Sequence, residues 1–335
     1  MLKFTRRAAI ASVAALGLAA SSVPAFADGH QMTFTLATSG SETDQRSVAM
    51  AEVFAPMVAG FADYQPGYNG TLFAQGTELE AIAAGNLTMS IASAQELAQF
   101  FPEFSIFATG YVHQDAAHQV RVFNDPLMDP FKQTVEDELG VKLLSVMYLG
   151  RRHVNLRQTR EELEVMTPED LAGVNLRMPG TDAWQFLGAA LGASPTPLAF
   201  SEVYTSLSSG AIDGQDNPLP TVVDQKFYEV TNQIALTSHL VDLNYIAFSL
   251  ETWNSLTPDQ QLTVQRAADA AAAYGRLRQL DKENNLADFI RAQGVEIYTP
   301  DLEAFRTHVQ AQYVGSEAAA SWPEGVLDRI NELGN

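Results

Sequence analysis

The stretch from Pro258 to about Ala292 keeps a helical pattern of apolar and polar residues over roughly 35 positions. At 1.5 Å per residue such a helix is about 50 Å long, which is more than one compact domain needs. Its start is marked by Thr257 as the capping residue, Pro258 in the first turn and Gln260 three residues after the Thr. We expect this helix to join two domains, with Gly275 as the position of any bend.

The rest of the chain alternates short apolar runs with helical stretches, which is the pattern of an α/β fold. No repeat or low-complexity linker separates the domains, so we expect the chain to cross between them several times. We place domain I at 28–150 plus about 240–275, and domain II at 151–239 plus about 276–335. The expected strands are Met32–Thr38, Tyr68–Phe73, Leu87–Ala92, Val141–Met147, Val174–Met178, Gln233–Thr237 and Tyr245–Ser249, and the expected helices include Arg46–Val58 and Phe131–Leu139.

The first 27 residues have the pattern of a cleaved export signal. Segment 1–7 is basic, 8–20 is almost wholly apolar, and Ala25-Phe26-Ala27 forms a cleavage site before Asp28. The apolar run is shorter than the roughly 20 residues that span a bilayer. We therefore expect residues 1–27 to be a signal peptide, used by the general secretory or the twin-arginine route, and the mature protein to lie in the periplasm.

Composition excludes several classes of function. The chain has 40 acidic against 20 basic residues and a formal net charge of −20, and such a surface repels nucleic acid and anionic lipid. It has no cysteine, so disulfides and thiolate metal sites are excluded. His113 and His118 are five residues apart, not the four that places two ligands on one helix face. There is no G-x-S-x-G, phosphate loop or G-x-G-x-x-G motif, so we expect no metal, no cofactor and no enzyme activity.

A charge is set into one of the apolar runs. In Val174–Met178 the apolar residues alternate with Asn175 and Arg177, and Pro179-Gly180 ends the run. An unpaired guanidinium that leaves water costs several kcal/mol, so Arg177 needs either water or an anion. Further along, Asp213–Pro218 is a polar stretch that we expect to be a turn, because Asn and Asp side chains bond their own backbone.

Four blocks of this region carry a resemblance to a known family. They are Leu176–Pro179, Leu191–Tyr204, Asp213–Pro218 and Lys226–Val230, and they read LRMP, LGASPTPLAFSEVY, DGQDNP and KFYEV. In this order they resemble the solute-binding proteins of tripartite ATP-independent periplasmic (TRAP) transporters, the DctP-like family. The resemblance extends more weakly over nearly the whole mature chain.

The resemblance implies a fold and a task. The fold is a two-domain periplasmic binding protein, type II-like and TRAP-type, with a cleft between the domains and a long bridging helix. The task is to capture a small organic anion and deliver it to a permease made of a small and a large integral-membrane subunit. We expect the binding protein to be a monomer.

The resemblance also implies site residues. Arg177 resembles the arginine that takes the ligand carboxylate in a bidentate pair, and Asn217 the asparagine whose amide bonds polar groups of the ligand. Arg152 resembles a second arginine of sialic-acid and sugar-acid binders, with its neighbour Arg151 as the alternative. Phe200 matches an aromatic residue beside the ligand, although ordinary core packing is the alternative.

The neighbourhood of these residues suggests the ligand. Because His153 and Asn155 are polar and close to Arg152 in sequence, we expect a polar pocket that includes His153 and binds a polyhydroxylated acid such as a uronate, an aldonate or a sialic acid. A C4-dicarboxylate or an organosulfonate is an alternative ligand. An alternative function is that of a ligand sensor, which docks onto a receptor and not onto a permease. Between Gln75-Gly76 and Gly85 the chain is about three residues shorter than the family pattern, which leaves one rim of the cleft open to interpretation.

Overall fold

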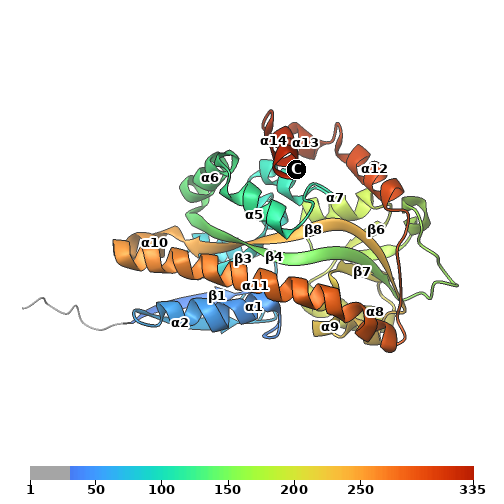
Figure 1. Cartoon of the computed structure of the whole chain (residues 1–335), viewed down its shortest axis with the longest axis horizontal. Coiled ribbons are helices and arrows are strands. Elements are labelled where there is room, and N and C mark those ends of the chain that lie inside the picture. The colour runs from blue at the N-terminus through green and yellow to red at the C-terminus, as the bar shows by residue number, and fades with distance from the viewer. Residues whose placement is uncertain (1–30) are drawn as a thin grey trace, which may run out of the picture. The chain divides into compact units, whose positions relative to one another are not determined.

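The computed structural model describes residues 31–335, and the predicted signal peptide lies outside the described residues. One mixed sheet of nine strands runs through this part of the chain in the order β2-β1-β3-β8-β4-β7-β5-β6, with β9 beside β8 (Figure 1). The strands are β1 (Met32–Ala37), β2 (Ala62–Gly67), β3 (Met89–Ser93), β4 (Val141–Leu156), β5 (Asn175–Met178), β6 (Ser194–Pro197), β7 (Gly214–Asn217), β8 (Gln233–Ser249) and β9 (Glu296–Tyr298).

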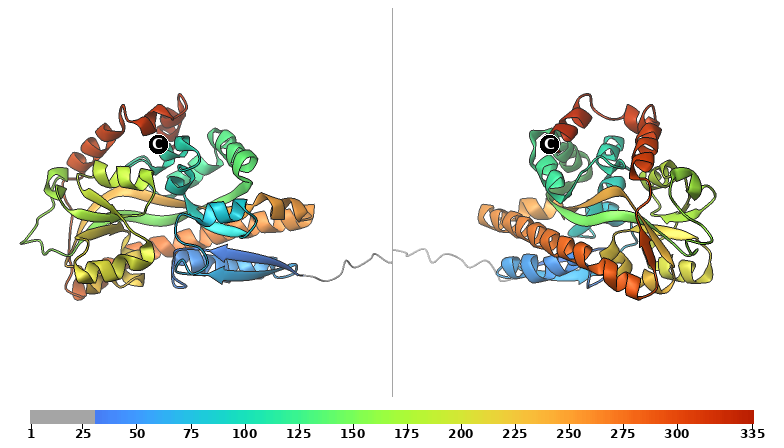
Figure 2. Two further views of the ribbon diagram at one scale, coloured as in Figure 1. Left: turned by 180° about the vertical axis from the view of Figure 1, so that it is seen from behind. Right: turned by 45° about the vertical axis from the view of Figure 1, so that its right-hand side comes forward.

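Helices cover both faces of the sheet (Figure 2). In the described part, no helix is both long and apolar enough to cross a membrane. The α-helices are α1 (Gln45–Ala49), α2 (Ala55–Val58), α3 (Glu78–Ala83), α4 (Ala94–Leu97), α5 (Ala116–Asn124), α6 (Asp129–Leu139), α7 (Asp182–Ala190), α8 (Val203–Ser209), α9 (Leu219–Asp224), α10 (Leu250–Ser255), α11 (Pro258–Ala292), α12 (Leu302–Tyr313), α13 (Glu317–Ala320) and α14 (Val326–Leu333), with a π-helical turn η1 (Met50–Phe54) between α1 and α2 and a 3₁₀ segment η2 (Pro102–Ala108) after α4.

Two long strands connect the two halves of the sheet. On one side of them lie β2, β1 and β3, and on the other lie β7, β5 and β6. The sequence predicts only the first part of β4, and it predicts the two ends of β8 as separate strands. The middle of β8 contains the polar residues Ser238, His239, Asp242 and Asn244. Because the strands are predicted from runs of apolar residues, this part of β8 is not predicted. His239, Asp242 and Asn244 are nevertheless buried, because β8 pairs with β4 along its length.

Helix α11 has the predicted bounds and runs along β4 across both halves (Figure 1). Thr257 and Gln260 form the predicted capping box. The helix continues through Gly275, where a Cβ atom would lie 3.1 Å from the Cβ of Ala49, so this glycine permits close packing against α1 and is no break in the helix. The prediction of an α/β fold with a long bridging helix is confirmed.

Strand β4 is irregular where it passes α11, with a shift of register between Tyr148 and Gly150. Two side chains of α11 hold this irregularity. The Tyr148 hydroxyl donates to one carboxylate oxygen of Glu283 (2.6 Å), and the Arg151 backbone N–H donates to the other (2.6 Å). The amide of Gln279 donates to the carbonyl oxygen of Leu149. Between these contacts Gly150 has φ +130°, and a Cβ there would lie 2.6 Å from Glu283. We call this group of contacts the β4 clamp.

The apolar core is divided between the halves of the sheet. Phe305 and Val309 of α12 pack with residues of the β5 side. Ile330 of α14, by contrast, packs with residues around Phe104 and Val122 on the β3 side. Helices α13 and α14 therefore lie against elements that the sequence-based division places in the other domain, and the exact domain boundaries stay a prediction.

Two local predictions are wrong. The strand expected at Tyr68–Phe73 lies earlier, at Ala62–Gly67, where β2 pairs in parallel with β1. The chain then turns through Asn69 and Gly70, which both have positive φ. The turn expected at Asp213–Pro218 is instead β7, whose four residues are all buried. Its polar side chains can be buried because they bond one another and their neighbours on β4 and β8.

Candidate functional site

A small cavity lies in the middle of the sheet, and residues from both halves line it. The enclosed space is about 30 Å³, which is room for one or two water molecules. A sugar acid therefore enters only after side chains move or the halves of the molecule separate. The lining residues are Ser39, Arg46, Gln75, Ile91, Ser93, Glu96, Leu149, Arg152, Arg177, Trp184, Phe200, Asn217, Thr221 and Asn244. Four of the five predicted site residues are among them.

Arg177, on β5, is almost completely buried, with 1% of its surface exposed. Its Nε and Nη2 donate to the carbonyl oxygen of Leu198 (2.9 and 2.7 Å), and Nη2 also donates to Oε1 of Gln75 (3.0 Å). These partners are neutral. Within residues 31–335 no carboxylate lies at ion-pair distance from the guanidinium, and Nη1 makes no hydrogen bond. Burial lowers the pKa of Arg177 well below its usual value.

The environment of Arg177 is incomplete without an anion. A buried charge is stable when an opposite charge and hydrogen bonds compensate for the lost hydration. A ligand carboxylate in the cavity would supply both, and the planar guanidinium matches its two oxygens. The amide oxygen of Gln75 accepts a hydrogen bond from Nη2 of Arg177, and a ligand carboxylate would need this same N–H group.

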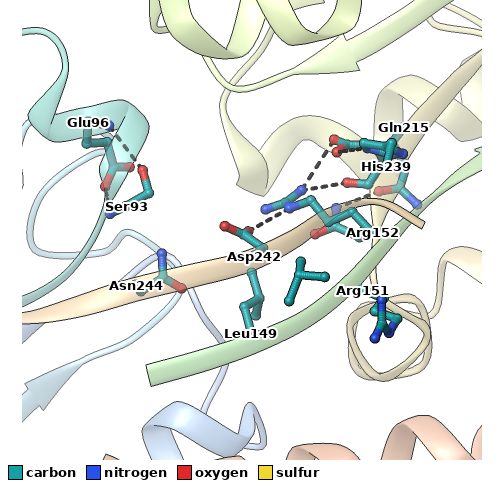
Figure 3. Close-up of polar contacts among 12 residues, drawn as sticks. Ser93, Glu96, Leu149, Arg151, Arg152, Gln215, His239, Asp242 and Asn244 are labelled. Carbon is teal, nitrogen blue, oxygen red and sulfur yellow. Dashed lines mark hydrogen bonds and ion pairs between the residues drawn. The ribbon is translucent and has the colours of Figure 1, made fainter. Parts of the chain in front are cut away.

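Arg152, on β4, has the opposite environment (Figure 3). Its Nε lies 2.6 Å from a carboxylate oxygen of Asp242, and its Nη1 lies 3.3 Å from one of Asp216. Nη1 also donates to the backbone oxygen of Asp216 (2.8 Å). The other Asp216 oxygen lies 3.1 Å from Nε2 of His239. The guanidinium lies 4.4 Å from the centre of the Trp184 ring. Arg152 lines the cavity, but carboxylates of the protein already compensate for its charge.

Arg151 and Arg152 are neighbours on β4, and only Arg152 faces the cavity. Arg152 lines the cavity, whereas Nη2 of Arg151 donates to the carbonyl oxygen of Gln114 (2.7 Å) outside it. His153 does not line the cavity in the described structure, because successive residues of β4 point to opposite faces of the sheet. Its Nδ1 accepts a hydrogen bond from the backbone N–H of Ser238 (3.2 Å). The geometry gives no support to His153 as a ligand-binding residue.

Asn217 is the last member of a row of buried amides. Its Nδ2 donates to Oε1 of Gln215 (2.5 Å), and Nε2 of Gln215 donates to Oδ1 of Asn155 (2.9 Å). Asn155 in turn donates to the carbonyl oxygen of Gln233 (2.9 Å). Each amide fixes the orientation of the next, so the Asn217 oxygen is left as an acceptor toward the cavity. The row also explains why a polar sequence forms the buried strand β7.

Phe200 lies between the cavity and the hydrophobic core, a position that fits both interpretations of the sequence. It lines the cavity, and the Arg177 guanidinium lies 5.5 Å from the centre of its ring. Its other neighbour is the core residue Phe227, with ring centres 6.0 Å apart. The ring thus connects the hydrophobic core to the guanidinium, which limits where the Arg177 side chain can move.

The β3 side of the cavity contributes one arginine and one carboxylic acid. Arg46 is held by two contacts with Asp44 (2.7 and 2.9 Å) and donates to Oδ1 of Asn244 (2.6 Å). Glu96 caps α4, where its Oε2 accepts from the backbone N–H of Ser93 (2.7 Å). Burial raises the pKa of Glu96. Arg177 is thus the one arginine of the three in the cavity lining that has no carboxylate partner in the described chain.

A larger hollow of about 700 Å³ lies between η2, α7 and α13. Its lining contains Asp182 and Glu317, and the described residues place no lysine, arginine or histidine there. An anion would be repelled by these two carboxylates with nothing to compensate for it. The smaller cavity is therefore the candidate binding site, despite its size.

The sequence misses the lining residues of the β3 side. Gln75, Glu96 and Asn244 lie in stretches without a recognisable motif, and they reach the cavity only because β8 brings β3 next to β4. Trp184 is missed for another reason. A tryptophan in an apolar helix such as α7 is ordinarily a core residue, and nothing in its spacing indicates a cavity.

Comparison with protein families settles the relationship. Residues 35–318 match the model of the DctP family, described as bacterial extracellular solute-binding protein, family 7. The chain belongs to this family. The predicted resemblance is confirmed, and it covers most of the described structure. The family consists of periplasmic substrate-binding proteins that serve transport.

Similar proteins support the assignment. The sialic acid-binding periplasmic protein SiaP of Vibrio cholerae is 32% identical over 239 residues, which are 70% of this chain and 72% of that protein. A crystal structure of a TRAP periplasmic solute-binding protein from Roseobacter denitrificans, with bound 3-deoxy-D-manno-oct-2-ulosonic acid (KDO), is 76% identical. Its TM-score is 0.90, and the match covers 91% of this chain and all of that one.

A second structure from Roseobacter denitrificans, with bound L-galactonate, is 25% identical with a TM-score of 0.81 and covers 91% of this chain and 99% of that one. These solved structures have the two-domain TRAP-type fold, which confirms the predicted fold class for this member.

Proposed function

We propose that this family member is an exported periplasmic protein that binds a sugar monocarboxylic acid of the KDO type and delivers it to a TRAP permease. The observation that carries the proposal is Arg177, a buried guanidinium in a cavity with no carboxylate partner among the described residues. The 76% identity to a structure with bound KDO supports the same class of ligand. We expect the ligand to be released chemically unchanged, because the family consists of substrate-binding proteins that serve transport.

The charges around the cavity favour one carboxylate in the ligand. Arg46 and Arg152 are already paired with aspartates, so Arg177 alone can compensate for an added negative charge in the described site. A second carboxylate, as in a C4-dicarboxylate, would stay uncompensated at a buried position. The predicted dicarboxylate alternative is therefore less favourable than a monocarboxylic acid with hydroxyl groups.

The test is a thermal-shift and calorimetry panel on the mature protein. The panel contains KDO, N-acetylneuraminate, L-galactonate and succinate. A ligand at 100 times its dissociation constant adds about 2.7 kcal/mol of stability to the folded state. We expect KDO to give the largest shift and succinate none. Failure of all three sugar acids to bind folded protein would overturn the proposal.

Export is tested separately. We expect intact-mass analysis of protein recovered from the periplasm to show a chain that begins at or near Asp28. A mature chain that retains residues 1–27 would contradict the predicted cleavage. Copurification with two integral-membrane subunits, in the presence of ligand, would test the delivery step.

A further inference from the structure

The proposed function assigns the ligand carboxylate to Arg177 but leaves the opposite end of the ligand without a partner. Arg177 belongs to β5, whereas Glu96 belongs to α4, the helix that directly follows β3. Strands β3 and β5 lie on opposite sides of β8 and β4, so the two side chains reach the cavity from opposite halves of the sheet. Figure 3 shows Glu96 on the α4 side and Arg152 on the other, with Asp242 and Asn244 drawn between them.

Glu96 has an unused acceptor in the cavity. Its residue surface is 7% exposed, and its hydrogen bonds within the described chain involve only Oε2. The backbone N–H of Glu96 bonds the Ser93 hydroxyl (3.1 Å), so both halves of the capping box hold the side chain in place. No hydrogen bond within residues 31–335 is assigned to Oε1, although the Ser93 hydroxyl lies near the carboxyl group, and the side chain lines the site. A capped, buried carboxyl group of this kind is a preorganised acceptor.

Trp184 provides an unused donor in the same cavity. The residue is 1% exposed, and its Nε1–H is buried without a hydrogen-bond partner in the described structure. Its ring is fixed by the Arg152 guanidinium at 4.4 Å. Because buried polar groups are ordinarily paired, an unpaired donor in a binding cavity indicates a missing ligand group. Helices α4 and α7, which carry Glu96 and Trp184, are in direct contact across the site.

A hydroxyl group both donates and accepts, and it therefore matches an unused acceptor and an unused donor. A second carboxylate would match the indole N–H, but it carries no hydrogen for the Glu96 acceptor and would be repelled by the ionised form of Glu96. We propose that Glu96, together with the Trp184 indole, determines specificity by bonding hydroxyl groups of the ligand and by excluding ligands with a second carboxylate. The inference rests on the proposed function, since it presupposes that Arg177 holds the only carboxylate.

The experiment measures the affinities of folded variants for KDO and for D-glucarate, a polyhydroxylated dicarboxylate, by calorimetry. For E96Q we expect KDO binding to weaken by about 10- to 100-fold, because the amide replaces one of the two carboxylate acceptors with an N–H donor. The ratio of the affinity for KDO to the affinity for D-glucarate should be smaller in E96Q than in wild type. For W184F, which keeps an aromatic ring and loses the donor, we expect a loss of about 3- to 10-fold.

E80Q is the control, because Glu80 is a carboxylic acid on the same side of the sheet but is exposed and does not line the cavity. Its KDO affinity should stay within threefold of wild type. An E96Q variant that binds KDO as tightly as wild type, while R177A does not bind, would overturn the specificity proposal and leave the proposed function intact. Wild type that binds D-glucarate at least as tightly as KDO would also overturn it. Folded wild type that binds neither KDO nor any other sugar acid would instead overturn the proposed function.

Discussion

Arg152 and Arg177 lie in the same cavity, and both are buried beside an aromatic ring. They differ in what surrounds the charge. Arg152 contacts two carboxylates at 2.6 and 3.3 Å, whereas Arg177 contacts a backbone carbonyl oxygen and an amide oxygen. Both arginines are thus buried beside an aromatic ring, but only the charge of Arg152 is compensated by carboxylates of the protein. We propose that charge compensation separates the structural arginine, Arg152, from the proposed ligand-binding one, Arg177.

The largest expected effect is the loss of ligand binding in R177A. Removing one partner of a buried ion pair costs about 3–5 kcal/mol, which is roughly two to three and a half decades of affinity. R177K should fail nearly as badly, because lysine keeps the charge but not the two-pronged geometry. Calorimetry with KDO measures both variants.

The free R177A protein should unfold within a few degrees of wild type, because no carboxylate of the described chain is left unpaired by the change. If R177A loses stability and keeps its KDO affinity, the arginine belongs to the fold, and the comparison with Arg152 is wrong.

R152A should show the reverse, with a loss of stability as the main effect. The change leaves Asp242 and Asp216 buried without their guanidinium, at a cost of about 3–5 kcal/mol in the free energy of unfolding. Denaturant unfolding of the ligand-free protein measures it. The double variant R152Q/D242N should recover part of the loss, because it removes one charge of each sign. A free energy of unfolding equal to that of wild type in R152A would remove the distinction between the two arginines.

Buried carboxylic acids can also lack a compensating charge, as Arg177 does. Glu78 is such a group, since it has no ion-pair partner within residues 31–335. Burial, together with the nearby Glu96, raises the pKa of Glu78 to about 8. The folded state then holds the proton more tightly than the unfolded state. The stability from this group is present at low pH and is lost as the pH rises from about 5 to 8, with a slope of at most about 1.4 kcal/mol per pH unit.

Unfolding free energies of wild type and E78Q, measured at several pH values, isolate this effect. Their difference should change across that range. A difference that is constant from pH 5 to 8 would show that Glu78 is ionised in the folded protein.

The smallest expected effect concerns Gln75, whose amide oxygen now occupies a donor position of Arg177. In Q75A the ligand carboxylate no longer competes with this amide, so we expect KDO binding to tighten by about two- to fivefold. The measurement is again calorimetry, with Q65A as the control because the side chain of Gln65 bonds only that of Asp63 in the described chain. Weaker binding in Q75A would mean that Gln75 assists the ligand and does not compete with it.

The sequence predicts one half of the site much better than the other. Arg177, Asn217 and Phe200 lie in motif blocks whose order is specific, and the structure places all three at the cavity. Glu96 and Gln75 belong to stretches without such motifs, and their positions depend on how β3 and β8 pair. Side chains that reach a site through long-range strand pairing carry no local signal in the sequence.

The fold shows the same division. The capping box and the apolar period give the bounds of α11 directly, because both are local features of the chain. Strand β7 and the middle of β8 could not be predicted from local features. Their polar residues are buried only because distant groups compensate for them, as Arg152 does for Asp216 and Asp242.

The β4 clamp has a mechanical consequence. Two strands and one helix pass side by side between the halves of the molecule, and Glu283 ties the helix to the irregular part of β4. Bodies that share a single flexible connection can turn about any axis. The segment between α12 and α14 adds a further crossing, and bodies joined by several connections can bend freely only about a line that passes close to all of them. Opening of the cavity is thereby reduced to one angle, so ligands of different sizes would stop the same motion at different points along a single path.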